Sequence, residues 1–129
     1  MRRRVANHII DSLDMRVAVI GDLALMRNRK YGLLCSRRCP ANTILEAYEL
    51  FRTWADDPGV TVISGFHSPV EKECLRLLLE GEANMIFCPA REIESMRLPK
   101  NWGNALDEGR MLILSPFAEK RADRSAICR

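Results

Sequence analysis

Short apolar runs separated by polar stretches set the layout of this chain. The runs are residues 17–20, 31–35, 60–63, 85–88 and 111–114. Each run ends at a turn-forming residue such as glycine, serine or proline, which is typical of buried strands in an alternating fold. We therefore expect these runs to be the strands of one sheet.

Between some of these runs the apolar residues recur at helical spacing. They do so from Ile44 to Trp54, and the sequence Asp-Asp-Pro-Gly at 56–59 ends the predicted helix after about four turns. A further helix is expected over residues 101–108, just before the last predicted strand. The chain therefore changes between strand and helix along most of its length.

The clearest helix start lies directly after the strand at 60–63. Ser68, Pro69 and Glu71 have the spacing of a capping box with proline at the first helical position. These residue types satisfy the free N–H groups of a helix N-terminus. The helix continues through a leucine-rich stretch to Gly81, its predicted C-cap.

Nearly all-apolar strands that alternate with helices indicate a parallel sheet buried on both faces. The predicted fold class is α/β: a Rossmann-like three-layer αβα sandwich with a mostly parallel sheet. With a length of 129 residues the chain suits one core, so residues 1–129 are expected to form a single domain. Basic residues mark an N-terminal arm of about residues 1–15 and a C-terminal tail of about residues 118–129.

Composition and charge narrow the class of protein. Hydrophobic residues make up 47% and charged residues 29% of the chain, which is the balance of a folded globular protein. The net charge of +3 is too small to identify a nucleic-acid-binding protein by itself. No stretch approaches the roughly 20 apolar residues of a membrane span, and no signal-peptide pattern is present. We expect a cytoplasmic protein with no membrane partner.

The cysteines predict neither a disulfide framework nor a metal site. The five are odd in number and scattered over the chain, and several lie in or beside apolar runs, as reduced cysteines do. Cys35, Cys39 and Cys88 alone do not complete the four ligands of a structural zinc site. No metal and no cofactor are expected.

Candidate binding residues gather where the predicted strands end. In a doubly wound sheet the ligand crevice lies outside the carboxyl ends of the strands, and helix N-termini there present N–H groups to anions. The loops at this edge carry hydroxyls, a glycine, arginines and an imidazole, which suit phosphate and base. The candidates are Ser36, Arg37, Arg38, Ser64, Gly65, Phe66, His67, Ser68, Arg91 and Ser115.

The order and spacing of these loops resemble the DNA-processing protein A (DprA/Smf) family. That family has a strand and a Gly-Ser-Arg-type turn, then a helix, then a strand that leads to Ser-Gly-Gly-Ala-x-Gly-Ile-Asp. Here Leu-Cys-Ser-Arg at 34–37 and Ser-Gly-Phe-His-Ser-Pro-Val-Glu at 64–71 stand in those places. The resemblance covers about residues 17–117. Phe66 and His67 replace small residues of the family's turn, and Glu71 replaces its aspartate.

Each candidate also has a structural interpretation. An arginine at a strand end such as Arg37 would be desolvated without compensation unless it meets an anion, so it is the stronger candidate of the Arg37–Arg38 pair. Glu71 completes the predicted capping box and is only a weak catalytic candidate. His67 is a ligand or a hydrogen-bonding residue of the turn, and Phe66 offers a stacking face.

Three functions stay open on the sequence. The resemblance implies a protein that holds single-stranded DNA by its phosphates. It also implies that the protein forms a homodimer and has a recombinase as a partner. Related Rossmann-like phosphoribohydrolases cleave N-glycosidic bonds with a glutamate, a role open to Glu71, but their Pro-Gly-Gly-x-Gly-Thr motif is absent. The third is a sensor of a free nucleotide. No Gly-x-Gly-x-x-Gly follows any predicted strand, which argues against a dinucleotide oxidoreductase.

Overall fold

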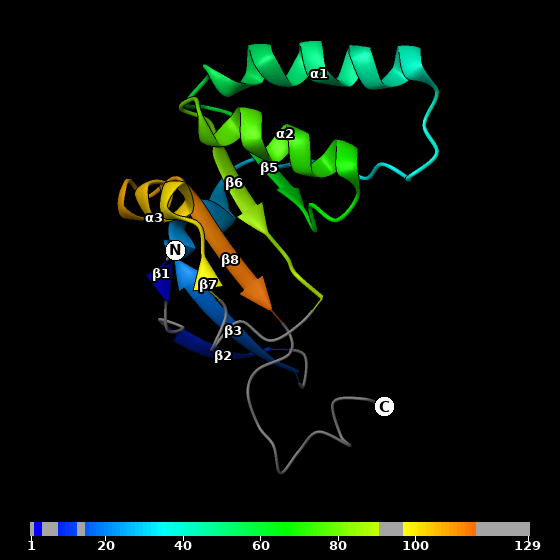
Figure 1. Cartoon of the computed structure of the whole chain (residues 1–129). Helices are drawn as coiled ribbons and strands as arrows, with labels where there is room; N and C mark the ends of the chain where they lie inside the picture. The colour runs from blue at the N-terminus through cyan, green and yellow to red at the C-terminus, as the bar shows by residue number, and fades with distance from the viewer. Residues whose placement is uncertain (1, 4–7, 13–14, 91–96, 116–129) are drawn as a thin grey trace.

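The computed structural model describes residues 2–3, 8–12, 15–90 and 97–115, and these form an α/β fold. Their main sheet has six strands in the order β2-β3-β8-β6-β5-β4 (Figure 1). A separate antiparallel pair joins β1 (Arg2–Arg3) to β7 (Arg97–Leu98). The predicted Rossmann-like α/β class is confirmed.

The parallel part of the sheet consists of β4 (Tyr31–Gly32), β5 (Thr61–Ser64), β6 (Asn84–Phe87) and β8 (Met111–Ser115). Each of these strands pairs in parallel with the next in the order β4-β5-β6-β8. The strands predicted over 60–63, 85–88 and 111–114 are thus confirmed, with bounds shifted by one residue at most. Their carboxyl ends meet at one edge of the sheet.

The other half of the sheet is antiparallel. β3 (Met15–Gly21) runs antiparallel to β8, and β2 (His8–Ser12) runs antiparallel to β3. The strand predicted over 17–20 is therefore confirmed, but it runs opposite to its neighbour β8. The basic arm expected over residues 1–15 contains strands, because residues 8–12 add to the sheet beside β3.

The strand predicted over 31–35 is wrong for its second half. β4 ends at Gly32, one further backbone bond runs from Leu33 N–H to the Ile63 carbonyl, and the chain then leaves the sheet. Leu34 is 96% exposed, so this apolar residue is not part of the core. An edge strand has a neighbour on one side only, and few bonds hold the chain in the sheet there.

Three helices follow the strands. They are α1 (Ala41–Ala55), α2 (Pro69–Leu79) and α3 (Lys100–Asp107), and all three contribute to the same apolar core on one face of the sheet. In the view of Figure 1, α2 lies between α1 and strands β5 and β6, and α3 lies beside β8. The 3-10 helix η1 (Leu23–Arg27) packs on the other face through Leu25.

Alternate residues of the strands serve the two faces. In β8, Met111 and Ile113 face the helices, whereas Leu112 packs in the smaller cluster with η1. Successive side chains point to opposite faces of the sheet, and both faces are buried, so nearly every residue of each strand is apolar. The helices predicted over 44–54 and 101–108 are confirmed, and no helix among the described residues is long and apolar enough to cross a membrane.

Gly81 follows α2 at a close approach between two parts of the chain. Glu80 is the C-cap, so the predicted cap at Gly81 lies one residue late. A side chain at Gly81 would collide with the backbone carbonyl of Ala55, which also accepts hydrogen bonds from Glu82 N–H and Ala83 N–H. Glycine is required here because the end of α1 presses on this turn.

Candidate functional site

The site edge is formed where the parallel strands end. Ser64 at the end of β5 pairs with Phe87 at the end of β6, and Phe87 pairs with Ile113 near the end of β8. The chain turns out of the sheet after β5 and β6. This brings the turn at 65–68, the start of α2 and residues 88–90 to one place, as the topology predicts.

α2 begins with the predicted capping box. The Ser68 hydroxyl accepts a hydrogen bond from Glu71 N–H at 3.3 Å, and Glu71 Oε1 accepts one from Ser68 N–H at 3.1 Å. Pro69 occupies the first turn, where its missing N–H costs nothing. Both capping residues are buried, so the helix start is a fixed part of the site.

Glu71 also ties two loops to the helix. Its Oε1 accepts a bond from His67 N–H at 2.7 Å, and its Oε2 accepts one from Cys35 N–H at 2.7 Å. Burial disfavours the charged carboxylate, but the backbone N–H groups of Cys35, His67 and Ser68 outweigh it and hold the pKa of Glu71 below its ordinary value. Glu71 is therefore a charged acceptor inside the site wall.

The turn between β5 and α2 carries an unusual backbone conformation. Phe66 has a φ of +46°, in the left-handed region that side chains other than glycine rarely occupy. The Ser64 hydroxyl accepts a hydrogen bond from Phe66 N–H at 3.0 Å and supports this turn. Phe66 is only 4% exposed, and its ring lies 6.1 Å from that of Phe87. Phe66 turns inward onto β6 and lines the pocket, and its role as a stacking face stays a prediction.

A pocket of about 340 Å³ opens beside this turn. Aromatic rings form much of its wall, since Phe66, Phe87 and Trp102 all line it, and the Phe87 and Trp102 rings meet edge to face at 5.2 Å. His67 and Lys72, both exposed, supply polar groups. The full lining is Gly65, Phe66, His67, Lys72, Leu75, Phe87, Pro89, Ala90 and Trp102.

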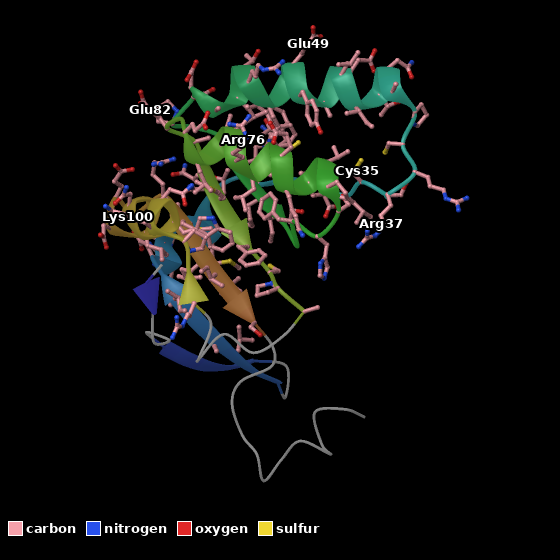
Figure 2. The ribbon with its side chains drawn as sticks, in the orientation of Figure 1. Cys35, Arg37, Glu49, Arg76, Glu82 and Lys100 are labelled. Carbon is pink, nitrogen blue, oxygen red and sulfur yellow. The ribbon has the colours of Figure 1, made fainter. Side chains whose placement is uncertain are left out.

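Ser36, Arg37 and Arg38 are exposed on the connection from β4 to α1. The Ser36 hydroxyl donates a hydrogen bond to the Arg38 carbonyl at 3.2 Å. Figure 2 shows Cys35 and Arg37 on this connection beside the N-terminal end of α2. The bond from Cys35 N–H to Glu71 holds the connection there, so both arginines lie at the same edge as the pocket.

The candidate residues thus divide by position. Gly65, Phe66 and His67 line the pocket; Ser64 and Ser68 shape its turn; Ser36, Arg37 and Arg38 lie on the neighbouring loop. Ser115 is buried at the end of β8, and it is not part of the pocket wall. Arg91 lies outside the described residues.

Lys72 and Trp102 also line the pocket, although neither was predicted from the sequence as a binding residue. Lys72 follows the capping box by one residue, so its place in the first turn of α2 was a usable signal. Trp102 comes from α3, and its position depends on how that helix packs beside β8. In the part of the chain that the structure describes, no group of three histidine, cysteine or acidic side chains is placed to hold a metal ion.

The strand order and the position of the pocket define the class of protein as a Rossmann-like α/β domain with a crevice at the carboxyl edge of its sheet. Neither protein-family models nor curated proteins gave a match to this chain. The solved structures did.

The chain is similar to DNA processing protein A from Helicobacter pylori, whose structure was solved for its unique single-stranded DNA binding mode. The TM-score is 0.58 at 20% sequence identity, and the match covers 81% of this chain and 48% of that one. The chain therefore has the fold of DNA processing protein A, over about half the length of that protein. The resemblance expected from the sequence is confirmed at the level of the fold.

Proposed function

We propose that this protein binds single-stranded DNA at the carboxyl edge of its parallel strands. The observation that carries the proposal is the fold shared with a protein described by its single-stranded DNA binding. Arg37 and Arg38 would contact phosphates, and the pocket beside Phe66 would take a base. The assignment of residues to these roles belongs to the proposal.

The geometry of the two loops supports this division of roles. Arg37 and Arg38 are exposed, so their guanidinium groups are open to phosphates, and Figure 2 shows Arg37 beside the N-terminal end of α2. Lys72 adds a cation at the pocket, and the apolar wall there suits the flat face of a base. A strand laid along this edge would place phosphates and bases against different side chains.

The hydrolase alternative receives less support from the same geometry. A catalytic glutamate needs a free oxygen that faces the substrate. Both oxygens of Glu71 already accept backbone N–H groups, from His67 and Ser68 on one side and from Cys35 on the other. Glu71 is better suited to hold the two loops in place than to attack or activate water.

The wider roles implied by the resemblance are part of the proposal too. They are a place in DNA processing or recombination, a homodimer, and a recombinase partner. The neighbouring structure is about twice as long as the matched region, so these roles rest on more than the shared domain.

Fluorescence anisotropy of a labelled oligo-dT tests the proposal. We expect binding that weakens as salt rises, because neutralised phosphates release counterions. Arg37→Ala should lower the affinity several-fold and reduce the slope of log K against log salt by about 0.7, the value for one phosphate contact on a single strand.

Arg29→Ala is the matched control. Arg29 is an exposed arginine that lies just before β4, at the opposite end of the sheet, where Asn28 bonds to Thr61 at the start of β5. The control removes the same charge. An equal loss of oligo-dT affinity in Arg29→Ala and Arg37→Ala would therefore show that the effect comes from net charge and not from the position of Arg37. If oligo-dT does not bind while a free nucleotide still raises the melting temperature, the DNA proposal fails and a nucleotide sensor takes its place.

A further inference from the structure

Two cysteines flank the arginine loop and meet across it. Cys35 lies after β4, and Cys39 lies directly before Pro40, the N-cap of α1. Their sulfur atoms are 2.8 Å apart, and both side chains are partly exposed. The intervening Ser36, Arg37 and Arg38 are exposed. A reagent in solution therefore has access to this pair.

The other described cysteines are placed differently. Cys74 is fully buried among the leucines of α2, and burial raises its pKa to about 12. Cys88 packs in the cluster on the opposite face of the sheet, where burial again raises the thiol pKa. Within the described ranges, Cys35 and Cys39 are the cysteines with a thiol as hydrogen-bond partner.

We infer that Cys35 and Cys39 form a redox-active thiol pair that low-molecular-weight disulfides convert to an intramolecular disulfide. A disulfide needs a sulfur separation of about 2.05 Å and Cβ atoms about 3.8 Å apart. The sulfurs start 2.8 Å apart, and they lie on a loop whose residues are exposed, so little stands between the pair and bonding distance. This inference does not depend on the proposed DNA binding.

The chemistry proceeds in two exchange steps. One thiolate attacks a sulfur of the small disulfide, forms a mixed disulfide and displaces the first small thiol. The second cysteine then attacks the protein sulfur of that mixed disulfide and displaces the second small thiol. The two protein thiols lose two electrons and two protons, and both protons leave on the two small thiols.

The environment of the pair bears on the rate of exchange. The hydrogen bond to Cys39, together with burial and the nearby charges of Cys39 and Glu71, raises the pKa of Cys35 to about 11. Because the thiolate is the attacking species, exchange at Cys35 should become faster as the pH rises.

Peptide mapping after exposure to oxidised glutathione tests this assignment on the full chain. We expect a Cys35–Cys39 cross-link, a protein mass lower by two hydrogen atoms, and full reversal by dithiothreitol. Closing a loop this short should raise the melting temperature by roughly 5 °C. Cys88→Ser is the matched control and should oxidise as the wild type does, whereas Cys39→Ser should form no cross-link.

Three results would overturn the inference. The first is a wild-type protein in which Cys35 and Cys39 both remain open to alkylation, or stay as glutathione adducts, after equilibration. The second is an oxidised protein that melts below the reduced one, because the loop would then have to distort in order to close. The third is a cross-link that joins either residue to a different cysteine.

Discussion

The carboxylate of Glu71 offers the sharpest test of how the site is held together. The substitution Glu71→Gln keeps the size and shape of the side chain and exchanges one oxygen for an NH2 group. In the folded protein Oε1 accepts from His67 and Ser68, and Oε2 accepts from Cys35. A glutamine oxygen can replace one carboxylate oxygen but not both. One set of backbone N–H groups must then face another donor.

The cost follows from the contacts. A glutamine that keeps its oxygen toward His67 and Ser68 leaves Cys35 N–H without an acceptor, which costs about 1–3 kcal/mol. The bonds that remain are weaker, because hydrogen bonds to a charged group are worth more than those to a neutral one. We expect the free energy of unfolding to fall by about 2 kcal/mol at pH 7. Domains of this kind have about 5–15 kcal/mol in total, so the variant stays folded.

The pH dependence gives a second and independent signature. The pKa of Glu71 is lowered in the folded protein from an ordinary value of 4.5. Its charge therefore stabilises the fold fully above about pH 4.5, and this stabilisation is lost as the pH falls through the lower folded pKa. Glutamine does not titrate. The stability difference between wild type and Glu71→Gln should accordingly shrink on acidification, because a protonated glutamate resembles glutamine.

Urea denaturation at pH 7 and near pH 3 measures both effects. Glu49→Gln is the control. Glu49 is exposed on α1, as Figure 2 shows, so this substitution removes the same charge from the surface of the protein. We expect that control to change the free energy of unfolding by less than about 0.5 kcal/mol. A Glu71→Gln protein as stable as the wild type at pH 7, or a difference that is the same at both pH values, would refute the argument.

Further substitutions test the backbone at two places, the turn at Phe66 and the turn that follows α2 at Gly81. Phe66→Gly should be more stable than Phe66→Ala by about 1 kcal/mol, because alanine keeps the strain of a left-handed φ and glycine does not; the opposite order in urea denaturation would contradict that conformation. Gly81→Ala should lower the free energy of unfolding by about 2 kcal/mol or more, since its new methyl group meets the Ala55 carbonyl. Gly32→Ala is its control, because a methyl group there meets nothing within 4 Å, and equal effects in the two variants would remove the steric explanation.

The elements of the core could be predicted because their sequence signals are local. In β5, β6 and β8, apolar side chains serve both faces, so each strand shows as a continuous apolar run. The start of α2 was equally clear, since Ser68 and Glu71 bond to each other in the way their spacing predicts. Signals of this kind need no knowledge of the rest of the chain.

Strand direction and strand ends lie beyond such signals. The run at 17–20 looks the same whether β3 is parallel or antiparallel to β8, because alternate burial does not depend on direction. The run at 31–35 is apolar throughout, yet only its first residues pair with β5. Leu34 is exposed because the chain must leave the sheet edge to place Cys35 against Glu71, and that contact spans 36 positions.

The candidate site was predicted in its loops but not in its wall. The topology alone brings together the turn at 65–68 and the loop with Arg37, since both follow parallel strands. Trp102 joins the wall through the packing of α3, which no nearby sequence signal reports. Phe66 was predicted as a stacking face, with nothing in the sequence to indicate its direction. Its backbone is left-handed, and its ring is buried.

Phe66 is unusual both in residue type and in backbone conformation. The resemblance to the DprA/Smf family places a small residue at this position of the turn, and glycine occupies a left-handed conformation without strain. This chain has a phenylalanine there and keeps the left-handed conformation, at a cost of roughly 1–2 kcal/mol. Burying the ring against Phe87 offsets that cost, since a buried phenylalanine contributes about 1.5–3 kcal/mol. The gain of this exchange is one ring of an aromatic wall, so a residue that departs from the family pattern lines the pocket together with Phe87 and Trp102.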